Sequence, residues 1–259
     1  MLEVYTWEPN ANSGKPLLLL KEKGTPFAYH YIDMGKREQH SPEYLKLNPS
    51  GTVPTVVHDG LTLTESSPAL EYLDAALEGP ALRPRDPYAR WRMRRWIRFL
   101  DHEYCPALAM FGGAAASARL PVQDAAAIER QVQAIPMPER RRVWRMILTK
   151  ALPEAELAES DRRISAGVQL FEQALSEHPY LAGPEYTLAD LVALITVYAM
   201  PITRPAEVND RLTPHYMDWF RRCHLRPAVQ ATFRLGRGWV SERVEATRQL
   251  LGIPTLAPT

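Results

Sequence analysis

The chain has 259 residues, of which 46% are apolar and 24% are charged, and its formal net charge is +1. These values are typical of a soluble globular protein that is long enough for two modest domains. A charge so close to zero gives no reason to expect nucleic acid or an anionic membrane as a partner.

The start of the chain and the cysteines indicate the cellular setting. Met1–Tyr5 is followed by a polar turn and not by the basic and then apolar stretch of a signal peptide. The most apolar segment, Leu188–Ile202, contains Asp190 and is too short to span a bilayer, so we expect a buried helix. Cys105 and Cys223 form neither a CxxC pair nor a metal-ligand spacing. We therefore expect a cytoplasmic protein with reduced cysteines, no metal site and no membrane contact.

The first elements alternate between strand and helix. Leu2–Thr6 alternates as a strand does, and Glu8–Gly14 is rich in turn-forming residues. Pro16 suits the first turn of a helix that continues to Lys23 and stops at Gly24. A second strand is expected over residues 27–32 and a short helix over residues 42–47.

A hairpin is predicted next. The loop Asn48–Pro54 leads into the β-branched run Thr55–His58, Asp59-Gly60 turns the chain, and Leu61–Leu63 returns it. A helix then starts at Ser66 and runs to about residue 77. The resulting order, βαβαββα, is that of a thioredoxin-like domain, in which the Val-Pro pair takes the place of a cis-proline.

The hairpin predicts a site for a small acidic peptide. If the Val53-Pro54 bond is cis, it turns the Val53 N–H and C=O outward, where an extended peptide can pair with them as a strand does. Ser66 falls at a helix start, where free N–H groups favour a carboxylate.

The rest of the chain is predicted to be helical. Prolines and mixed charge over residues 79–87 indicate a linker, so the expected domains are residues 1–78 and residues 88–259. Residues 111–150 are irregular and predict either a lid over a site or a surface excursion without function. Thr187-x-x-Asp190 is a capping box before the apolar segment. Residues 237–259 predict a helix and a loose tail.

The motif Asn48-Pro49-x-Gly51-x-Val53-Pro54, followed by Glu65-Ser66, resembles the glutathione-binding half of the glutathione transferases. The resemblance implies an α/β thioredoxin-like N-terminal domain, an all-α C-terminal domain and a homodimer. It also implies that the Val53 backbone holds the cysteinyl unit and that Glu65 and Ser66 hold the γ-glutamyl carboxylate. The residues expected to bind glutathione are Gln39, His40, Thr52, Val53, Pro54, Glu65 and Ser66. Gln39 and His40 have a second interpretation, a surface loop without a role.

The turn before the first helix offers the thiolate donor. A thiol with a pKa of about 8.5 ionises at neutral pH only with help from a donor or a helix N-terminus. Ser13 is the first candidate and Asn12 the second, although either side chain can instead cap the helix. Lys15 either contributes to the same anionic pocket or is exposed. The turn has no cysteine, which disfavours thiol transfer by an enzyme cysteine.

A denser set of residues is similar to the bacterial lignin β-etherases, and within them to the β(S)-ether branch. It comprises Ala11-Asn12-Ser13-x-Lys15-Pro16, Glu22-Lys23-Gly24, Glu38-Gln39-His40, Thr64-Glu65-Ser66, residues 135–139 with Trp144, and residues 181–190. This resemblance implies thiolate attack on the carbon β to a ketone, with release of a phenol. Trp144, Tyr104, Phe111 and Tyr198 are then candidates for the aryl pocket. Two alternatives are a transferase or peroxidase acting on other hydrophobic electrophiles, and a non-catalytic glutathione transferase-like binding protein.

Overall fold

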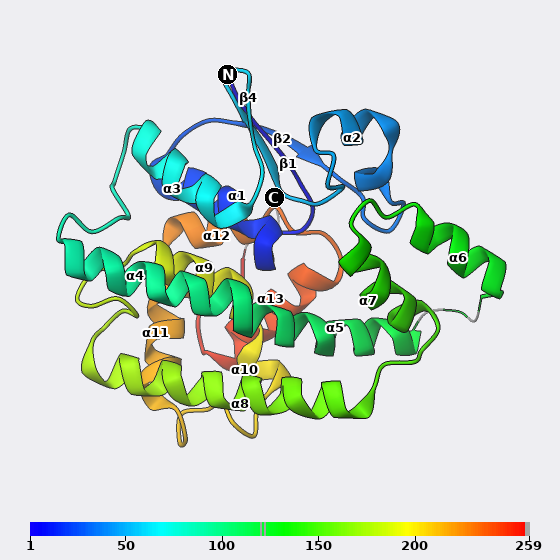
Figure 1. Cartoon of the computed structure of the whole chain (residues 1–259). Helices are drawn as coiled ribbons and strands as arrows, with labels where there is room; N and C mark the ends of the chain where they lie inside the picture. Colours follow the sequence, from blue (N-terminus) through cyan, green and yellow to red (C-terminus); the bar gives the residue numbers. More distant parts are fainter. Residues whose placement is uncertain (120, 122, 257–259) are drawn as a thin grey trace.

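The computed structural model describes residues 1–119, 121 and 123–256, so the end of the predicted tail, residues 257–259, lies outside the described part. The N-terminal elements occur in the predicted order βαβαββα (Figure 1). They are β1 (Leu2–Thr6), α1 (Ala11–Lys23), β2 (Ala28–Tyr31), a 3-10 turn η1 (Glu38–His40), α2 (Pro42–Leu47), β3 (Thr55–His58), β4 (Leu61–Leu63) and α3 (Ser66–Ala76). The thioredoxin-like prediction is therefore confirmed.

The four strands form one sheet in the order β2-β1-β3-β4, with β1 and β2 parallel and the other pairs antiparallel. Val4 in the centre of β1 pairs with Tyr29 on one side and with Val56 on the other, and it is fully buried. Asp59 and Gly60 both adopt positive φ, as the two central residues of a tight hairpin turn require. Alternation and turn chemistry thus account for the register of the sheet.

Helix α1 begins at Ala11, earlier than predicted and inside the segment Glu8–Gly14 that was expected to be a turn. The segment Asn12–Gly14, expected as a turn, forms the first turn of the helix, and the Gly14 N–H donates to the Asn10 carbonyl at 3.1 Å. Gly14 also has no room for a side chain, because an added Cβ would meet Ile195 and the Pro9 carbonyl carbon at 2.7 Å. Close packing against the second half of the chain therefore supports a helical turn where the local sequence favours a loop.

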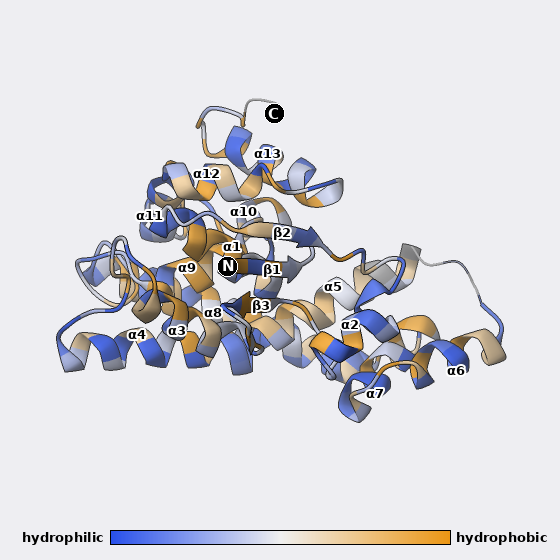
Figure 2. Cartoon of the chain, turned by 90° about the horizontal axis from the view of Figure 1, so that it is seen from above, coloured by the Kyte–Doolittle hydropathy of each residue, from blue (hydrophilic) through white to orange (hydrophobic). Residues whose placement is uncertain are grey.

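The second half consists of helices, which Figure 1 shows packed beneath the sheet and α3. Figure 2 gives the view from above. They are α4 (Pro87–Phe99), a π-helical segment η2 (Leu100–Tyr104), α5 (Cys105–Arg119), α6 (Ala125–Gln133), α7 (Pro138–Leu148), α8 (Glu154–Glu177), α9 (Leu188–Val197), α10 (Met200–Thr203), α11 (Pro214–His224), α12 (Pro227–Phe233) and α13 (Trp239–Leu250). This arrangement confirms the predicted all-helical C-terminal part.

The apolar segment after the capping box is buried as predicted, but it is two helices and not one. α9 ends at Val197, and α10 begins at Met200 with Pro201 in its first turn. All residues of α9 except Thr196 are buried, and the helix packs against α1 and α4. The capping box is present, with the Thr187 N–H donating to Asp190 Oδ2 at 2.9 Å. The box therefore fixes the start of the helix that supports α1.

Residues 111–150 are more regular than predicted, because the Gly- and Ala-rich part continues α5 and most of the rest forms α6 and α7. Both figures show α6 and α7 projecting to one side of the molecule. Ile128, Val132 and Leu148 form a small core of their own, with Trp144 packed against it. This pair of helices still contacts the N-terminal elements, since the Arg37 guanidinium donates to Gln131.

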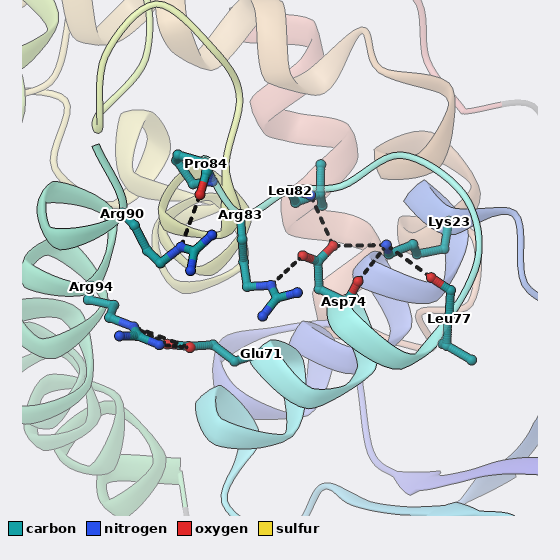
Figure 3. Close-up of polar contacts among 9 residues, drawn as sticks. All are labelled: Lys23, Glu71, Asp74, Leu77, Leu82, Arg83, Pro84, Arg90 and Arg94. Carbon is teal, nitrogen blue, oxygen red and sulfur yellow. Dashed lines mark hydrogen bonds and ion pairs between the residues drawn. The ribbon is translucent and has the colours of Figure 1, made fainter. Parts of the chain in front are cut away.

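The segment between α3 and α4 is held by the buried carboxylate of Asp74 (Figure 3). Asp74 Oδ1 accepts from the Leu82 N–H at 2.9 Å and pairs with Lys23 Nζ at 3.0 Å, and Oδ2 accepts from Arg83 Nε at 2.8 Å. Burial alone raises the pKa of Asp74, but the Leu82 N–H, Arg83 and Lys23 together outweigh it and hold the pKa below its ordinary value. Charged Asp74 therefore stabilises the connection between the two halves.

This network predicts a loss of stability in acid. A carboxyl group whose pKa is lowered on folding contributes stability that is present above the unfolded pKa of about 4 and is lost as pH falls through the folded pKa. We expect the wild-type free energy of unfolding, from urea titrations at pH 7 and at pH 3.5, to fall more than that of Asp74→Asn. An equal fall in the two proteins would contradict the assignment.

Candidate functional site

The first turn of α1 presents free backbone donors at the end of β1. Its N-cap, Asn10, has an extended backbone and makes no side-chain capping bond, and the first turn has no acidic residue. The positive end of the helix dipole is therefore uncompensated by the helix itself. Ser13 is 6% exposed, and its carbonyl accepts from the Thr6 hydroxyl at 3.0 Å. Asn12 is half-buried beside it, so both predicted donors lie where an anion would be favoured.

The predicted cis bond is present between Val53 and Pro54. Two side chains hold the loop before it: the Tyr44 hydroxyl and Asn48 Nδ2 donate to the Thr52 carbonyl at 2.6 and 2.9 Å. Within residues 1–119, 121 and 123–256, no hydrogen bond of a turn, loop or side chain uses the Val53 backbone. The Val53 N–H and C=O thus stay available to an extended peptide.

Lys15 connects the start of α3 to the helical half. The exposed alternative for this residue is wrong, because Lys15 is 1% exposed. Its Nζ donates to the hydroxyls of Ser66 at 3.3 Å and Ser67 at 3.1 Å, and to Asp101 Oδ1 in η2 at 2.5 Å. Glu65, the residue before α3, is exposed with φ of 59°, a conformation that costs of order 1–3 kcal/mol outside glycine. The structure therefore places a cation and an unusual backbone at the predicted Glu65-Ser66 site.

Gln39 and His40 meet the Val-Pro loop. Gln39 is 4% exposed and therefore does not lie in an exposed surface loop, whereas its part in binding stays a prediction. A Cβ at Gly51 would lie 2.8 Å from the His40 ring and 3.2 Å from the Gln39 carbonyl oxygen. Gln39 Oε1 and His40 Nδ1 are buried without a hydrogen-bond partner among the described residues. Burial, followed by the charges of Arg37 and Arg140, lowers the pKa of His40. Such unsatisfied groups fit a polar ligand.

An apolar cavity of about 440 Å³ adjoins the first turn of α1. Asn10 and Ala11 form part of its wall, and helices α5, α10 and α13 form much of the remainder. Its volume and lining are those of a site for a small hydrophobic molecule.

Two of the four aromatic candidates lie in this cavity. Phe111 and Tyr198 line it, and Arg204 stacks over the Phe111 ring at 5.0 Å. Tyr104 is instead fully buried in the core, and Trp144 belongs to the α6–α7 cluster, so neither is a wall residue.

Sequence reasoning missed several cavity residues. Four residues from separate parts of the chain also line the cavity: Asn10 before α1, Arg204 after α10, and Trp239 and Arg243 in α13. The cavity end of α13 is positioned by Glu8, which is 2% exposed and accepts from the Arg237 N–H at 2.7 Å. No local pattern signals a contact between residues so far apart in sequence.

The described part of the chain contains no group of three or more His, Cys, Asp or Glu side chains arranged to hold a metal ion. No helix within the described ranges is both long and apolar enough to cross a membrane. Both cysteines are free thiols.

Two domains of one protein family match the chain. The N-terminal domain of the glutathione S-transferases matches residues 11–76, and the C-terminal domain of the same proteins matches residues 135–227. The matched ranges include the start of α1, the Val-Pro loop, α3 and α9.

Individual relatives cover nearly the whole chain. Protein LigF of Sphingobium sp. (strain NBRC 103272 / SYK-6) is 35% identical over 242 residues, which is 90% of this chain and 93% of that protein. The crystal structure of the β-etherase LigF superposes with a TM-score of 0.85 and covers 91% of this chain and 99% of that one, at 34% identity. Glutathione S-transferase F13 of Arabidopsis thaliana is 27% identical over 88% of this chain and 92% of its own length.

Proposed function

The chain belongs to the glutathione S-transferase family, and from this membership we propose that it cleaves β-aryl ether bonds of lignin-derived aromatic ketones with glutathione. The observation that carries the proposal is the apolar cavity against the uncapped first turn of α1. The similarity to LigF, whose crystal structure is described as that of a β-etherase, supports this choice of electrophile. The implied homodimer stays a prediction.

The residues of the site fit a bound glutathione. The free Val53 backbone suits its cysteinyl unit, and Ser66 at the start of α3 suits its γ-glutamyl carboxylate. The unsatisfied buried atoms of Gln39 and His40 suit its glycyl end. Thr52, Pro54 and Glu65 complete the proposed binding set.

When bound, glutathione supplies a thiolate whose sulfur forms a bond to Cβ as the Cβ–O bond breaks, with the electron pair leaving on the aryl oxygen. Ser13 and Asn12 hold the sulfur as the anion by hydrogen bonding, and the first turn of α1 adds its dipole. The apolar cavity walls hold the aryl group in place, so that Cβ and the thiolate meet in a reactive geometry more often. The neighbouring ketone activates Cβ, so the chain needs little acid catalysis.

The proposal is tested with a racemic β-guaiacyl ether ketone, intact protein and glutathione, followed by chiral chromatography. We expect one enantiomer to disappear, with one guaiacol released for each glutathione consumed. No guaiacol from protein that is still retained on glutathione resin would contradict ether cleavage. That outcome would favour a family member that acts on another electrophile or only binds.

The thiolate donors are tested separately. Ser13→Ala and Asn12→Ala each remove one candidate donor. We expect the variant that removes the principal donor to have a kcat roughly 10- to 100-fold lower, because the sulfur anion loses a hydrogen bond near the transition state. Glutathione affinity, measured by calorimetry, should change much less.

Ser160→Ala is the matched control, since Ser160 is also buried, at 8% exposure, but does not line the cavity. Unchanged turnover in both the Ser13 and the Asn12 variant, with ether cleavage present, would refute the donor assignment.

A further inference from the structure

At the cavity wall, the hydroxyl of Tyr198 is a buried donor that has no hydrogen-bond partner in the described part of the chain. Tyr198 follows α9, is 6% exposed and lines the cavity. The side chains of Arg243 and Asn10 lie close to the hydroxyl. Its oxygen nevertheless makes no hydrogen bond of normal geometry within the described residues. A buried hydroxyl left unpaired is destabilising, so an acceptor in the cavity would remove this penalty.

Arg243 brings a positive charge to the same wall. It extends from α13, and its guanidinium lies 4.9 Å from the centre of the Trp239 ring. In the part of the chain that the structure describes, Arg243 forms no ion pair with a carboxylate. Its charge is therefore available to an anionic or partly anionic ligand.

Arg204 shows the contrast. It lines the same cavity, but its guanidinium lies 2.6 Å from Asp161 and 2.9 Å from Glu207. Two carboxylates thus neutralise Arg204 inside the protein. Arg243 is the better candidate for recognising a negative charge on the substrate.

We propose that Tyr198 and Arg243 form a phenoxide subsite that binds the aryl oxygen as it leaves Cβ. This assignment rests on the proposed ether cleavage for its catalytic role. The cavity also has Asn10 and Ala11 in its wall, so the subsite lies in the same space as the sulfur held at the start of α1. As the S–Cβ bond forms and the Cβ–O bond breaks, the aryl oxygen gains a negative charge. The Tyr198 O–H donates to it, Arg243 attracts it, and the released phenoxide takes a proton from water.

The protonation of Tyr198 is consistent with a donor role. Burial raises the pKa of Tyr198 to about 12, although the Arg243 charge opposes this rise. An ordinary phenol titrates near 10, so Tyr198 keeps its proton while the leaving phenol ionises. The subsite therefore stabilises phenoxide by hydrogen bonding and charge, without proton transfer from the chain.

Binding of two probes that differ in one oxygen atom tests the subsite without turnover. 4-Nitrophenolate carries the oxyanion, and nitrobenzene has the ring without it. We expect glutathione-loaded wild-type protein to bind the phenolate more tightly, by calorimetry. Tyr198→Phe and Arg243→Gln should each weaken phenolate binding about tenfold and leave nitrobenzene binding unchanged. Equal losses for the two probes, or no loss for the phenolate, would overturn the proposal.

Two further variants control for structural effects. Tyr186→Phe removes another buried hydroxyl that has no hydrogen-bond partner among the described residues. Tyr186 does not line the cavity, so this variant should leave both affinities unchanged. Arg243→Lys keeps the charge and should retain most of the phenolate affinity. If Tyr186→Phe caused the same selective loss of phenolate affinity, the loss in Tyr198→Phe could not be assigned to a contact inside the cavity, and the proposal would fail.

A leaving-group series tests the catalytic role. With β-aryl ether ketones whose phenols differ in acidity, Tyr198→Phe should slow the least acidic leaving groups most, which steepens the dependence of rate on phenol pKa. A purely structural role would slow all members equally and would overturn the role assigned to Tyr198. If no ether is cleaved at all, the proposed function fails, whereas the probe binding still decides whether the subsite exists.

Discussion

Replacing Asp190 by alanine is expected to lower the free energy of unfolding by about 3–5 kcal/mol, because the carboxylate satisfies several buried donors at once. Asp190 is fully buried. It accepts from the Leu181 and Thr187 N–H groups at 2.9 Å, from the Thr187 hydroxyl at 3.1 Å and from Trp219 Nε1 at 3.0 Å. Alanine leaves all four donors without this acceptor.

The loss of stability in this variant should also disturb the first turn of α1, where the candidate site lies. α9 starts at this network, and its Ile195 lies against Gly14 in the first turn of α1. Urea titration measures the stability change, with Asp218→Ala as the control. Asp218 is exposed, and its ion pair with Arg221 is long, at 3.4 Å. Its replacement should therefore change the free energy of unfolding by no more than about 0.5 kcal/mol. A loss below about 1 kcal/mol in Asp190→Ala would show that the donors find other partners.

Replacing Lys15 by methionine is expected to reduce glutathione affinity at least about tenfold and the free energy of unfolding by roughly 3 kcal/mol. Its ammonium group is buried between α1, the start of α3 and η2. Methionine keeps most of the volume but leaves the Asp101 carboxylate without this cation. It also removes the donor that positions Ser66 and Ser67. The γ-glutamyl end of glutathione would then meet a mobile helix start beside an unbalanced negative charge.

Calorimetry with glutathione and urea titration separate the two effects of this change. The binding measurement is made at a temperature at which circular dichroism shows the variant folded. Lys46→Met is the control, because Lys46 is exposed on α2 and makes no ion pair within the described residues. Unchanged glutathione affinity in folded Lys15→Met would remove Lys15 from the binding site and leave it a purely structural role.

Elements with a strong local pattern could be predicted from the sequence. The hairpin was predictable because Asp59 and Gly60 tolerate positive φ and because alternation sets the register. The capping box was predictable because Thr187 and Asp190 form reciprocal side-chain to backbone hydrogen bonds within one turn. These preferences act over a few residues, so neighbouring sequence is sufficient to reveal them.

The start of α1 was predicted wrongly for a physical reason. Asn10–Gly14 is rich in residues that favour turns, and Pro16 lacks the N–H that would bond to the Asn12 carbonyl. Local propensity thus places the helix start after Gly14, with Pro16 in the first turn. Gly14 packs against Ile195, 181 positions later in the chain, and this contact favours a helix that starts before Gly14. Asn12 and Ser13 therefore lie in the first turn of α1.

The sequence by itself determined the order of the N-terminal elements, the cis-proline position and the residues resembling a glutathione site, because each depends on short-range chemistry. Only the tertiary structure decided that Lys15 is buried against Asp101, 86 positions away. The same holds for Glu8, which accepts a hydrogen bond from the Arg237 N–H, 229 positions away. The cavity wall containing Tyr198 and Arg243 follows from the same long-range packing. Burial and the pairing of charges depend on which surfaces meet, and a linear pattern does not specify that meeting.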